Sequence, residues 1–184
     1  MPLDPQLLAQ VLRTPDTEDV TQSSIVNDVI LRDPANAADL VAALQAGDAL
    51  EASNARLILC QFDSRAAPWL LTELANAGLD ARQQILEVLW TVLITETPTT
   101  IRESLGLVKA KLNMLLDDRT ALPDLAPDYI ERDFSGRLCD LVYIVIQQLL
   151  SPNFDQSLFR SLDDAGRDAQ ITALKRSDLS DTVA

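Results

Sequence analysis

Hydrophobic residues recur along most of this chain at the three- and four-residue spacing of an amphipathic α-helix. Leu40 and Leu44 fall on one face of a predicted helix, and Leu70 and Leu74 fall on one face of another. No segment alternates convincingly between apolar and polar residues as a half-buried strand would. The pattern predicts an all-α protein with helices over 5–13, 16–31, 34–46, 49–62, 65–77, 80–95, 98–116, 134–150, 154–163 and 166–176.

Prolines mark several of these helix starts. A capping side chain followed by proline supplies an oxygen for an unpaired N–H group and then a residue whose φ already suits a helix. Five dipeptides have this form: Asp4-Pro5, Thr14-Pro15, Asp33-Pro34, Thr97-Pro98 and Ser151-Pro152.

A weak internal repeat separates two segments by about thirty residues. The segment 40–47 resembles the segment 70–78: both are rich in Leu and Ala, both end in Gly, and Asp48 or Asp80 follows within two residues. Self-similarity at this period is typical of helical-repeat arrays, which commonly form binding surfaces.

Four short segments resemble HEAT-like, armadillo-type helical repeats. Residues 63–71 resemble the turn and second helix of such a repeat, and residues 80–86 resemble the opening of the next one. Residues 137–141 and 167–171 are similar to helix openings in divergent bacterial members. The resemblance covers 34–176 and implies a right-handed α-α superhelix of nine to ten helices that acts as an interaction scaffold. It implies no particular ligand, because a fold does not by itself give a function.

At 184 residues the chain has the length of one all-helical domain. Within it we expect acidic N-terminal helices over 1–33, the clearest repeat helices over 34–116 and an acidic irregular linker over 117–133. C-terminal helices over 134–176 and a disordered tail over 177–184 complete the predicted organisation.

Several side chains have a predicted place in the fold. The helix 80–95 is apolar on so much of its surface that it should be buried on more than one side, whereas 98–116 is amphipathic. Trp69, Trp90 and Tyr143 lie at core spacing. Arg137 and Asp140, at i and i+3, can pair on one helix face, either to anchor a neighbouring element or as a polar anchor in a groove.

The charge balance narrows the range of partners. The chain has 28 acidic and 15 basic residues, a net charge of −13. Nucleic-acid binding requires a basic surface, and anionic membranes also attract basic segments, so neither partner is expected. A basic protein is the complementary partner, although an acidic surface also serves solubility alone. Residues 1–50 carry eight acids against two Arg.

The sequence lacks the residues and motifs of the common catalytic sites. There is no histidine, and neither GxGxxG nor GxxxxGK[ST] occurs. Cys60 and Cys139 each lie in an apolar helical pattern, where free cysteine behaves as a small buried hydrophobe. The linker carboxylates could ligate Mg²⁺ or Ca²⁺, but the twelve-residue Ca²⁺-loop pattern is missing. We therefore predict no catalytic, cofactor-binding or metal-binding residues.

The primary hypothesis is a non-enzymatic helical-repeat module that binds a partner protein. The alternative is an acidic inhibitor, of the immunity-protein type, that neutralises a basic toxin or nuclease; a metal-dependent enzyme that uses the linker carboxylates is a second alternative. The candidate partner-binding residues are Asp16, Glu18, Asp19, Asp28, Asp33, Asp39, Tyr129 and Phe134, the last two as exposed aromatic anchors beside the linker.

The start of the chain has no basic and then apolar signal segment, and the longest apolar run, 138–150, is too short to span a membrane. These features predict a cytoplasmic protein. Twelve Arg against three Lys, with abundant Ala, are typical of a GC-rich bacterial source.

Overall fold

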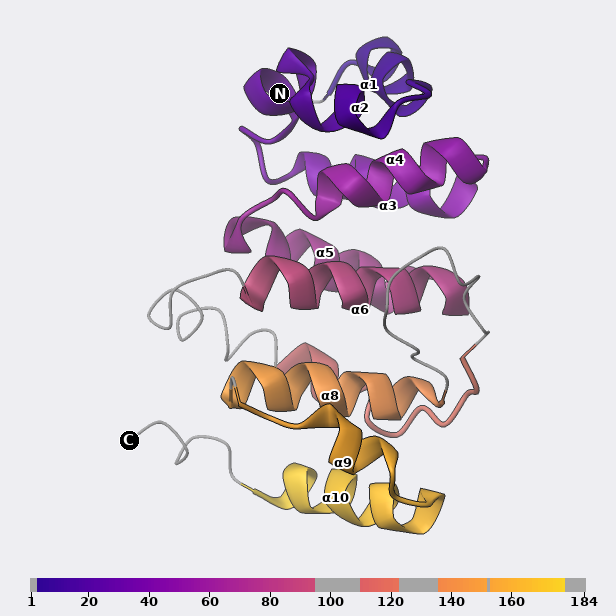
Figure 1. The fold of residues 1–184 in the computed structure, drawn as a ribbon, viewed down its shortest axis with the longest axis vertical. Coiled ribbons are helices and arrows are strands. Elements are labelled where there is room, and N and C mark those ends of the chain that lie inside the picture. Colours follow the sequence, from indigo (N-terminus) through magenta and orange to yellow (C-terminus); the bar gives the residue numbers. More distant parts are fainter. Residues whose placement is uncertain (1–2, 95–109, 123–135, 152, 178–184) are drawn as a thin grey trace. The chain divides into compact units, whose positions relative to one another are not determined.

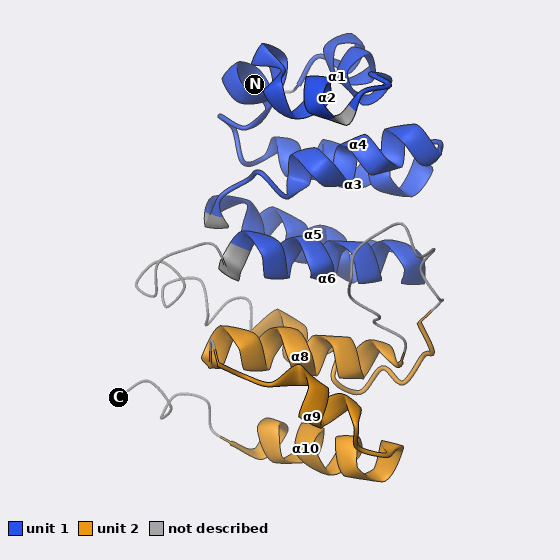
Figure 2. Ribbon diagram, viewed as in Figure 1, with its two compact units in different colours: residues 1–108 blue, residues 109–184 orange. Residues whose placement is uncertain are grey.

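The computed structural model describes residues 3–94, 110–122, 136–151 and 153–177 (Figure 1). These residues are mostly helical, and no strand forms among them apart from an isolated antiparallel bridge between Ala121 and Arg137. The predicted all-α class is confirmed. The chain forms two compact units, residues 1–108 and residues 109–184 (Figure 2).

Unit 1 is a set of helices that pack both on their chain neighbours and on helices further along the chain. Helix α3 packs on α4 and α5 on α6, while α3 also contacts α5 and α6, and α1 and α2 contact α4. The elements are α1 (Pro5–Leu12), α2 (Thr17–Gln22), the π-helical η1 (Val26–Ile30), α3 (Asn36–Ala46), α4 (Ala49–Leu59), the 3₁₀ turn η2 (Ser64–Ala66), α5 (Ala67–Asn76) and α6 (Leu79–Ile94).

The core of unit 1 follows the predicted apolar faces. Leu40 and Leu44 of α3 and Leu70 and Leu74 of α5 are all buried. Helix α6 is buried continuously from Ile85 to Trp90, as its apolar surface predicted. Each buried leucine contributes about 1.5–3 kcal/mol relative to an exposed one, so these faces hold the unit together.

The thirty-residue spacing has a structural counterpart in unit 1. Helix α3 ends at Ala46 and α5 at Asn76, while α4 begins at Ala49 and α6 at Leu79. The two glycines, however, do not occupy equivalent positions. Gly47 is the C-cap of α3, where an added Cβ would lie 2.6 Å from the carbonyl oxygen of Ala43, whereas the C-cap of α5 is Ala77.

Some predicted boundaries are wrong. The helix expected over 16–31 is split, because Ser23 is extended and η1 follows it. Asp16, rather than Thr14, caps α2 by accepting the backbone N–H of Glu18 at 2.8 Å. Asp4 caps α1 before Pro5 as predicted.

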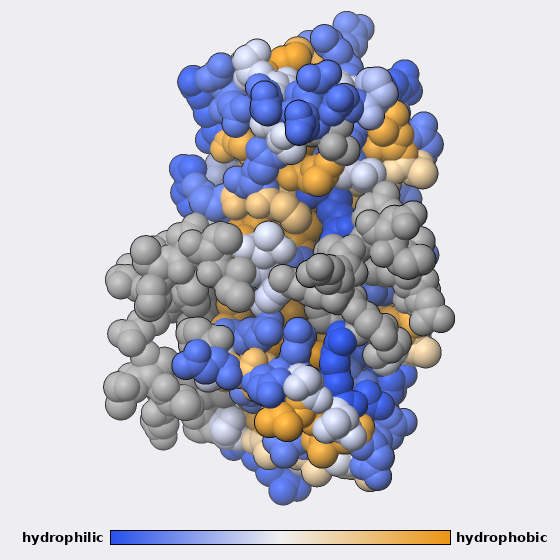
Figure 3. Space-filling model, in the orientation of Figure 1, coloured by the Kyte–Doolittle hydropathy of each residue, from blue (hydrophilic) through white to orange (hydrophobic). Residues whose placement is uncertain are grey.

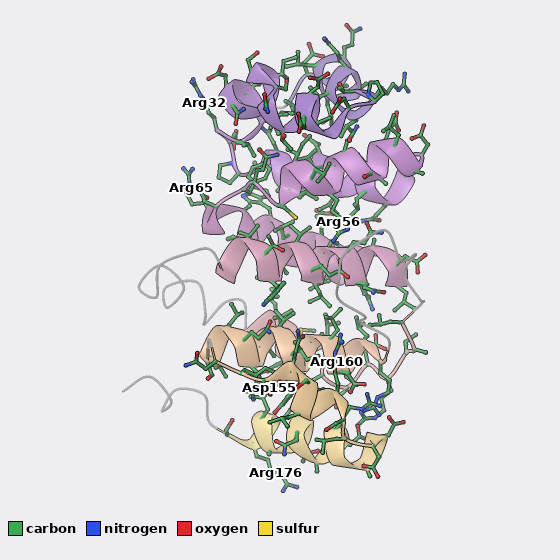
Figure 4. All side chains as sticks on the ribbon, in the orientation of Figure 1. Arg32, Arg56, Arg65, Asp155, Arg160 and Arg176 are labelled. Carbon is green, nitrogen blue, oxygen red and sulfur yellow. The ribbon has the colours of Figure 1, made fainter. Side chains whose placement is uncertain are left out.

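Two polar contacts cross the apolar layers of unit 1. The buried Asn54 amide of α4 donates to the carbonyl oxygens of Leu12 and Thr14 at the end of α1. Between α4 and α6, Arg56 Nη2 lies 3.0 Å from Glu87 Oε2, with side chains only 11 % and 4 % exposed. Figure 4 shows Arg56 between these two helices.

Unit 2 contains α8 (Leu138–Leu150), α9 (Gln156–Arg160) and α10 (Asp164–Arg176). Helix α10 packs on α8, and most of α8 is buried. Residues 110–113 are helical, but 114–116 form turns, so the helix predicted over 98–116 ends earlier than expected; residues 98–109 lie outside the described part of the chain. Residues 118–122 are irregular as expected and pair with the start of α8: Leu138 N donates to Thr120 O and Cys139 N to Asp118 O.

Trp90 and Tyr143 are buried as predicted, but the core prediction for Trp69 is wrong. Trp69 lies in the first turn of α5 and is 44 % exposed. The following residues, Leu70 and Leu71, take the buried positions of that turn, which leaves the indole on the outer side of the helix.

The stability of unit 1 should depend strongly on the Arg56–Glu87 pair. Glu87→Gln leaves the Arg56 charge buried beside a neutral amide, and we expect a loss of about 3 kcal/mol in the free energy of unfolding. Asp28→Asn removes a carboxylate of an exposed pair with Arg32 and should cost less than about 1 kcal/mol. Urea unfolding followed by tryptophan fluorescence measures both. Equal costs for the two variants would contradict this role for the buried pair.

Candidate functional site

The six predicted acidic residues lie on α2, η1, α3 and the turns before them, all in unit 1. Two of them support local structure, since Asp16 caps α2 and Asp33 accepts the N–H of Ala35 ahead of α3. Asp28 forms an exposed ion pair with Arg32 at 3.0 Å. Glu18, Asp19 and Asp39 are exposed and have no ion pair among the described residues. Tyr129 and Phe134 lie outside the described residues.

The arginines of unit 1 are mostly neutralised within the unit. Ion pairs join Arg13 to Glu51, Arg32 to Asp28, Arg56 to Glu87 and Arg65 to Asp63. Arg32 and Arg65 project away from the helices in Figure 4. The hydrogen bond from Arg13 to Glu51 raises the pKa of Arg13. The hydrogen bonds from Arg65 lower the pKa of Asp63.

This pairing leaves an acidic exterior on unit 1. Residues 1–108 contain 15 acidic residues against 6 arginines, a net charge of −9, whereas residues 109–184 have 13 acidic and 9 basic residues, a net charge of −4. Figure 3 shows mostly hydrophilic residues over the N-terminal helices of unit 1, with several hydrophobic patches among them. The candidate interaction residues Glu18, Asp19 and Asp39 belong to the more acidic unit.

Unit 2 contains a compact Arg–Asp network at the start of α8. Arg137 binds Asp140 through two hydrogen bonds, 3.1 Å from Nε and 2.9 Å from Nη2, and also lies 2.9 Å from Asp168 of α10. Arg119 binds the same Asp168 oxygen at 2.7 Å, and Arg167 lies 3.7 Å from Asp140. Three arginines thus meet three aspartates, the third being Asp164, whose pKa Arg167 lowers.

The network joins three parts of unit 2: the segment 118–122, the start of α8 and the first half of α10. Because its charges balance, it offers little net attraction for an ion and fits the anchoring interpretation of Arg137 and Asp140. Sequence spacing indicated only this i, i+3 pair. Arg119 and Asp168 are 49 residues apart and meet only through the tertiary packing.

Two linker carboxylates are described, and both are engaged. Lys175 lies 2.6 Å from Asp117, while Asp118 accepts the backbone N–H and hydroxyl of Thr120 at 3.0 Å and 2.6 Å. Across the described part of the chain, no group of three or more Cys, Asp or Glu residues could hold a metal ion. The other linker carboxylates lie outside that part.

Aromatic residues of α8, α9 and the segment before α9 line a surface hollow of unit 2 that α10 also borders. Tyr143 stacks on Phe159 with ring centroids 4.4 Å apart and meets Phe154 edge-on at 6.0 Å. Two clefts of about 310 Å³ and 360 Å³ share Tyr143 and Gln170, and Leu158, 67 % exposed, lines the first of them. The sequence does not predict this surface or the exposure of Trp69 in unit 1, because periodicity does not show which apolar side of a helix lacks a neighbour.

No described helix is both long and apolar enough to cross a bilayer. Comparison with models of protein families, with curated proteins and with solved structures found no match. The case for a function therefore rests on the charge and geometry of the two units.

The Arg–Asp network should be needed for the stability of unit 2. Asp140→Asn would leave Arg137 without its buried carboxylate, and we expect a loss of about 3 kcal/mol in unfolding free energy. Asp164→Asn removes an exposed carboxylate of the same network and should cost much less than Asp140→Asn. Urea unfolding followed by circular dichroism distinguishes them, and a neutral Asp140→Asn variant would contradict the anchoring role.

The two cysteines should react slowly with a thiol reagent in the folded protein. Burial raises the pKa of both thiols, and Cys139 is fully buried whereas Cys60 is partly exposed. Since the thiolate is the reactive form, we expect Cys60 to react before Cys139, and both at least about tenfold more slowly than in urea. Single Cys60→Ser and Cys139→Ser variants, titrated with an aromatic disulfide at pH 8, give each rate. Faster labelling of Cys139 would contradict this assignment.

Proposed function

We propose that this protein is a non-enzymatic interaction module that binds a basic partner protein through the acidic exterior of unit 1. The observation that carries the proposal is the internal neutralisation of the arginines. Four arginines of unit 1 are paired within the unit, while Glu18, Asp19 and Asp39 are exposed with no ion pair among the described residues. Unpaired charge of one sign on one unit attracts a partner of the opposite sign and speeds its association.

We further propose that α3–α4 and α5–α6 are two HEAT-like helix pairs within a superhelical repeat array. The thirty-residue offset between their ends supports this assignment. Such arrays present extended surfaces to partners, which is consistent with an interaction module.

The narrower form of the proposal is an inhibitor of the immunity-protein type, whose basic partner is a toxin or a nuclease. The same carboxylates would serve it, because fast, charge-steered association suits an inhibitor. Loss of the partner's own activity on adding this protein separates the inhibitor from a simple scaffold.

The proposal predicts that partner capture depends on salt and on three named carboxylates. We expect full-length tagged protein to retain a basic protein from a lysate of the source organism at low salt and to lose most of it at moderate salt. The triple variant Glu18→Gln, Asp19→Asn, Asp39→Asn should slow association with the purified partner by at least about threefold, measured by surface plasmon resonance.

A matched control separates local charge from net charge. Asp63→Asn, Asp117→Asn and Asp164→Asn together change the net charge equally, but remove carboxylates that already pair with Arg65, Lys175 and Arg167. This variant should associate at close to the original rate. Equal effects of the two triple variants, or a partner held equally well at both salt concentrations, would contradict the proposal.

A further inference from the structure

A hollow on unit 1 lies where the end of α3 meets the start of α6. It has a volume of about 400 Å³ and is lined by Leu44, Gln45, Gly78, Leu79, Asp80, Ala81 and Gln84. Leu44 and Ala81 are buried, whereas Gln45, Gly78 and Asp80 are exposed. The hollow thus combines an apolar inner wall with polar groups that solvent and a partner can reach.

Two sources of negative charge meet in this hollow, and together they exceed the partial positive charge of about one half at the N-terminus of α6, which also lines it. Asp80 contributes a carboxylate that has no ion pair among the described residues. Leu44 and Gln45 belong to the last turn of α3, which contains no basic side chain. The last carbonyl groups of a helix form the negative end of its dipole, and a nearby cation is favourable there.

The amides of Gln45 and Gln84 add oxygen acceptors to the same wall. A guanidinium group has five N–H donors in a plane and a long aliphatic stem. Leu44, Leu79 and Ala81 can cover that stem, while Asp80 and the amide oxygens can accept from its end. An arginine fits this combination better than an inorganic cation, which has no apolar part to bury, and better than a lysine, whose ammonium lacks the planar set of five donors.

We propose that this hollow is the anchor site for an arginine side chain of the basic partner. This inference rests on the proposed function and names the partner group that unit 1 recognises. It is separate from the surface of Glu18, Asp19 and Asp39, because none of those residues lines the hollow.

The test uses a short probe and the full chain. The peptide acetyl-Gly-Arg-Gly-amide is titrated into ¹⁵N-labelled protein, with acetyl-Gly-citrulline-Gly-amide as the neutral match in shape. We expect saturable shifts at the backbone amides of 78–81 and at the side-chain amides of Gln45 and Gln84 with the arginine peptide only. Equal shifts with the citrulline peptide, or shifts centred on α2 instead, would overturn the proposal.

Variants on the rim of the hollow make the test sharper. Asp80→Asn should weaken arginine-peptide binding by about threefold, the size of effect typical of an exposed ion pair, whereas Asp39→Asn should leave it unchanged. Gln84→Glu adds a second carboxylate to the wall and should strengthen binding by a similar factor. Because an unfolded variant cannot bind more tightly, this gain distinguishes a site effect from a folding defect. Equal effects of Asp80→Asn and Asp39→Asn would overturn the anchor site.

The outcome for the hollow is distinguishable from the outcome for the proposed function. Loss of partner capture in the Glu18, Asp19 and Asp39 triple variant, with no arginine-peptide binding at 78–81, would reject the hollow alone. Capture that is independent of salt and of that triple variant would reject the proposed function, whatever the peptide does.

Discussion

The packing of α3 against α4, α5 and α6 is the interaction on which unit 1 depends. It buries the leucine faces of consecutive helices, and it also brings the last turn of α3 beside the first turn of α6. The apolar core and the polar hollow are therefore two results of one packing arrangement. A sequence that lost Leu44 would lose both a core side chain and the inner wall of the hollow.

The two units use charged residues differently. In unit 1, four separate ion pairs each neutralise one arginine, while other acidic residues stay exposed without an ion pair among the described residues. In unit 2, arginines and aspartates gather into one balanced network that connects α8, α10 and the segment before α8. Exposed unpaired charge favours association with a partner, whereas the balanced network joins the three segments of unit 2 that contribute to it. The net charge of the whole chain does not show this difference between the two units.

Helix positions and core faces could be predicted from the sequence because both depend on local spacing. Leu40 and Leu70 followed that rule, and the start of α1 followed from Asp4 and Pro5. The exposed Trp69 could not be predicted, because the helix periodicity that placed it near the core does not show which side α6 covers. The break at Ser23 was missed for a related reason, since 16–31 has helical spacing throughout and only tertiary packing separates α2 from η1.

The candidate site shows the same limit more strongly. Composition located the acidic excess in the N-terminal part of the chain, but it could not separate Asp16, which caps a helix, from Asp19, which has no ion pair among the described residues. Both are aspartates in an acidic segment, and only the hydrogen bond of Asp16 to the backbone of Glu18 distinguishes them. Asp80 lies outside that segment. It becomes part of the hollow only because packing brings it beside Leu44 and Gln45, some 35 residues earlier in the chain. A recognition site built from a helix end and a distant carboxylate is a property of packing, and packing is what a single sequence leaves undetermined.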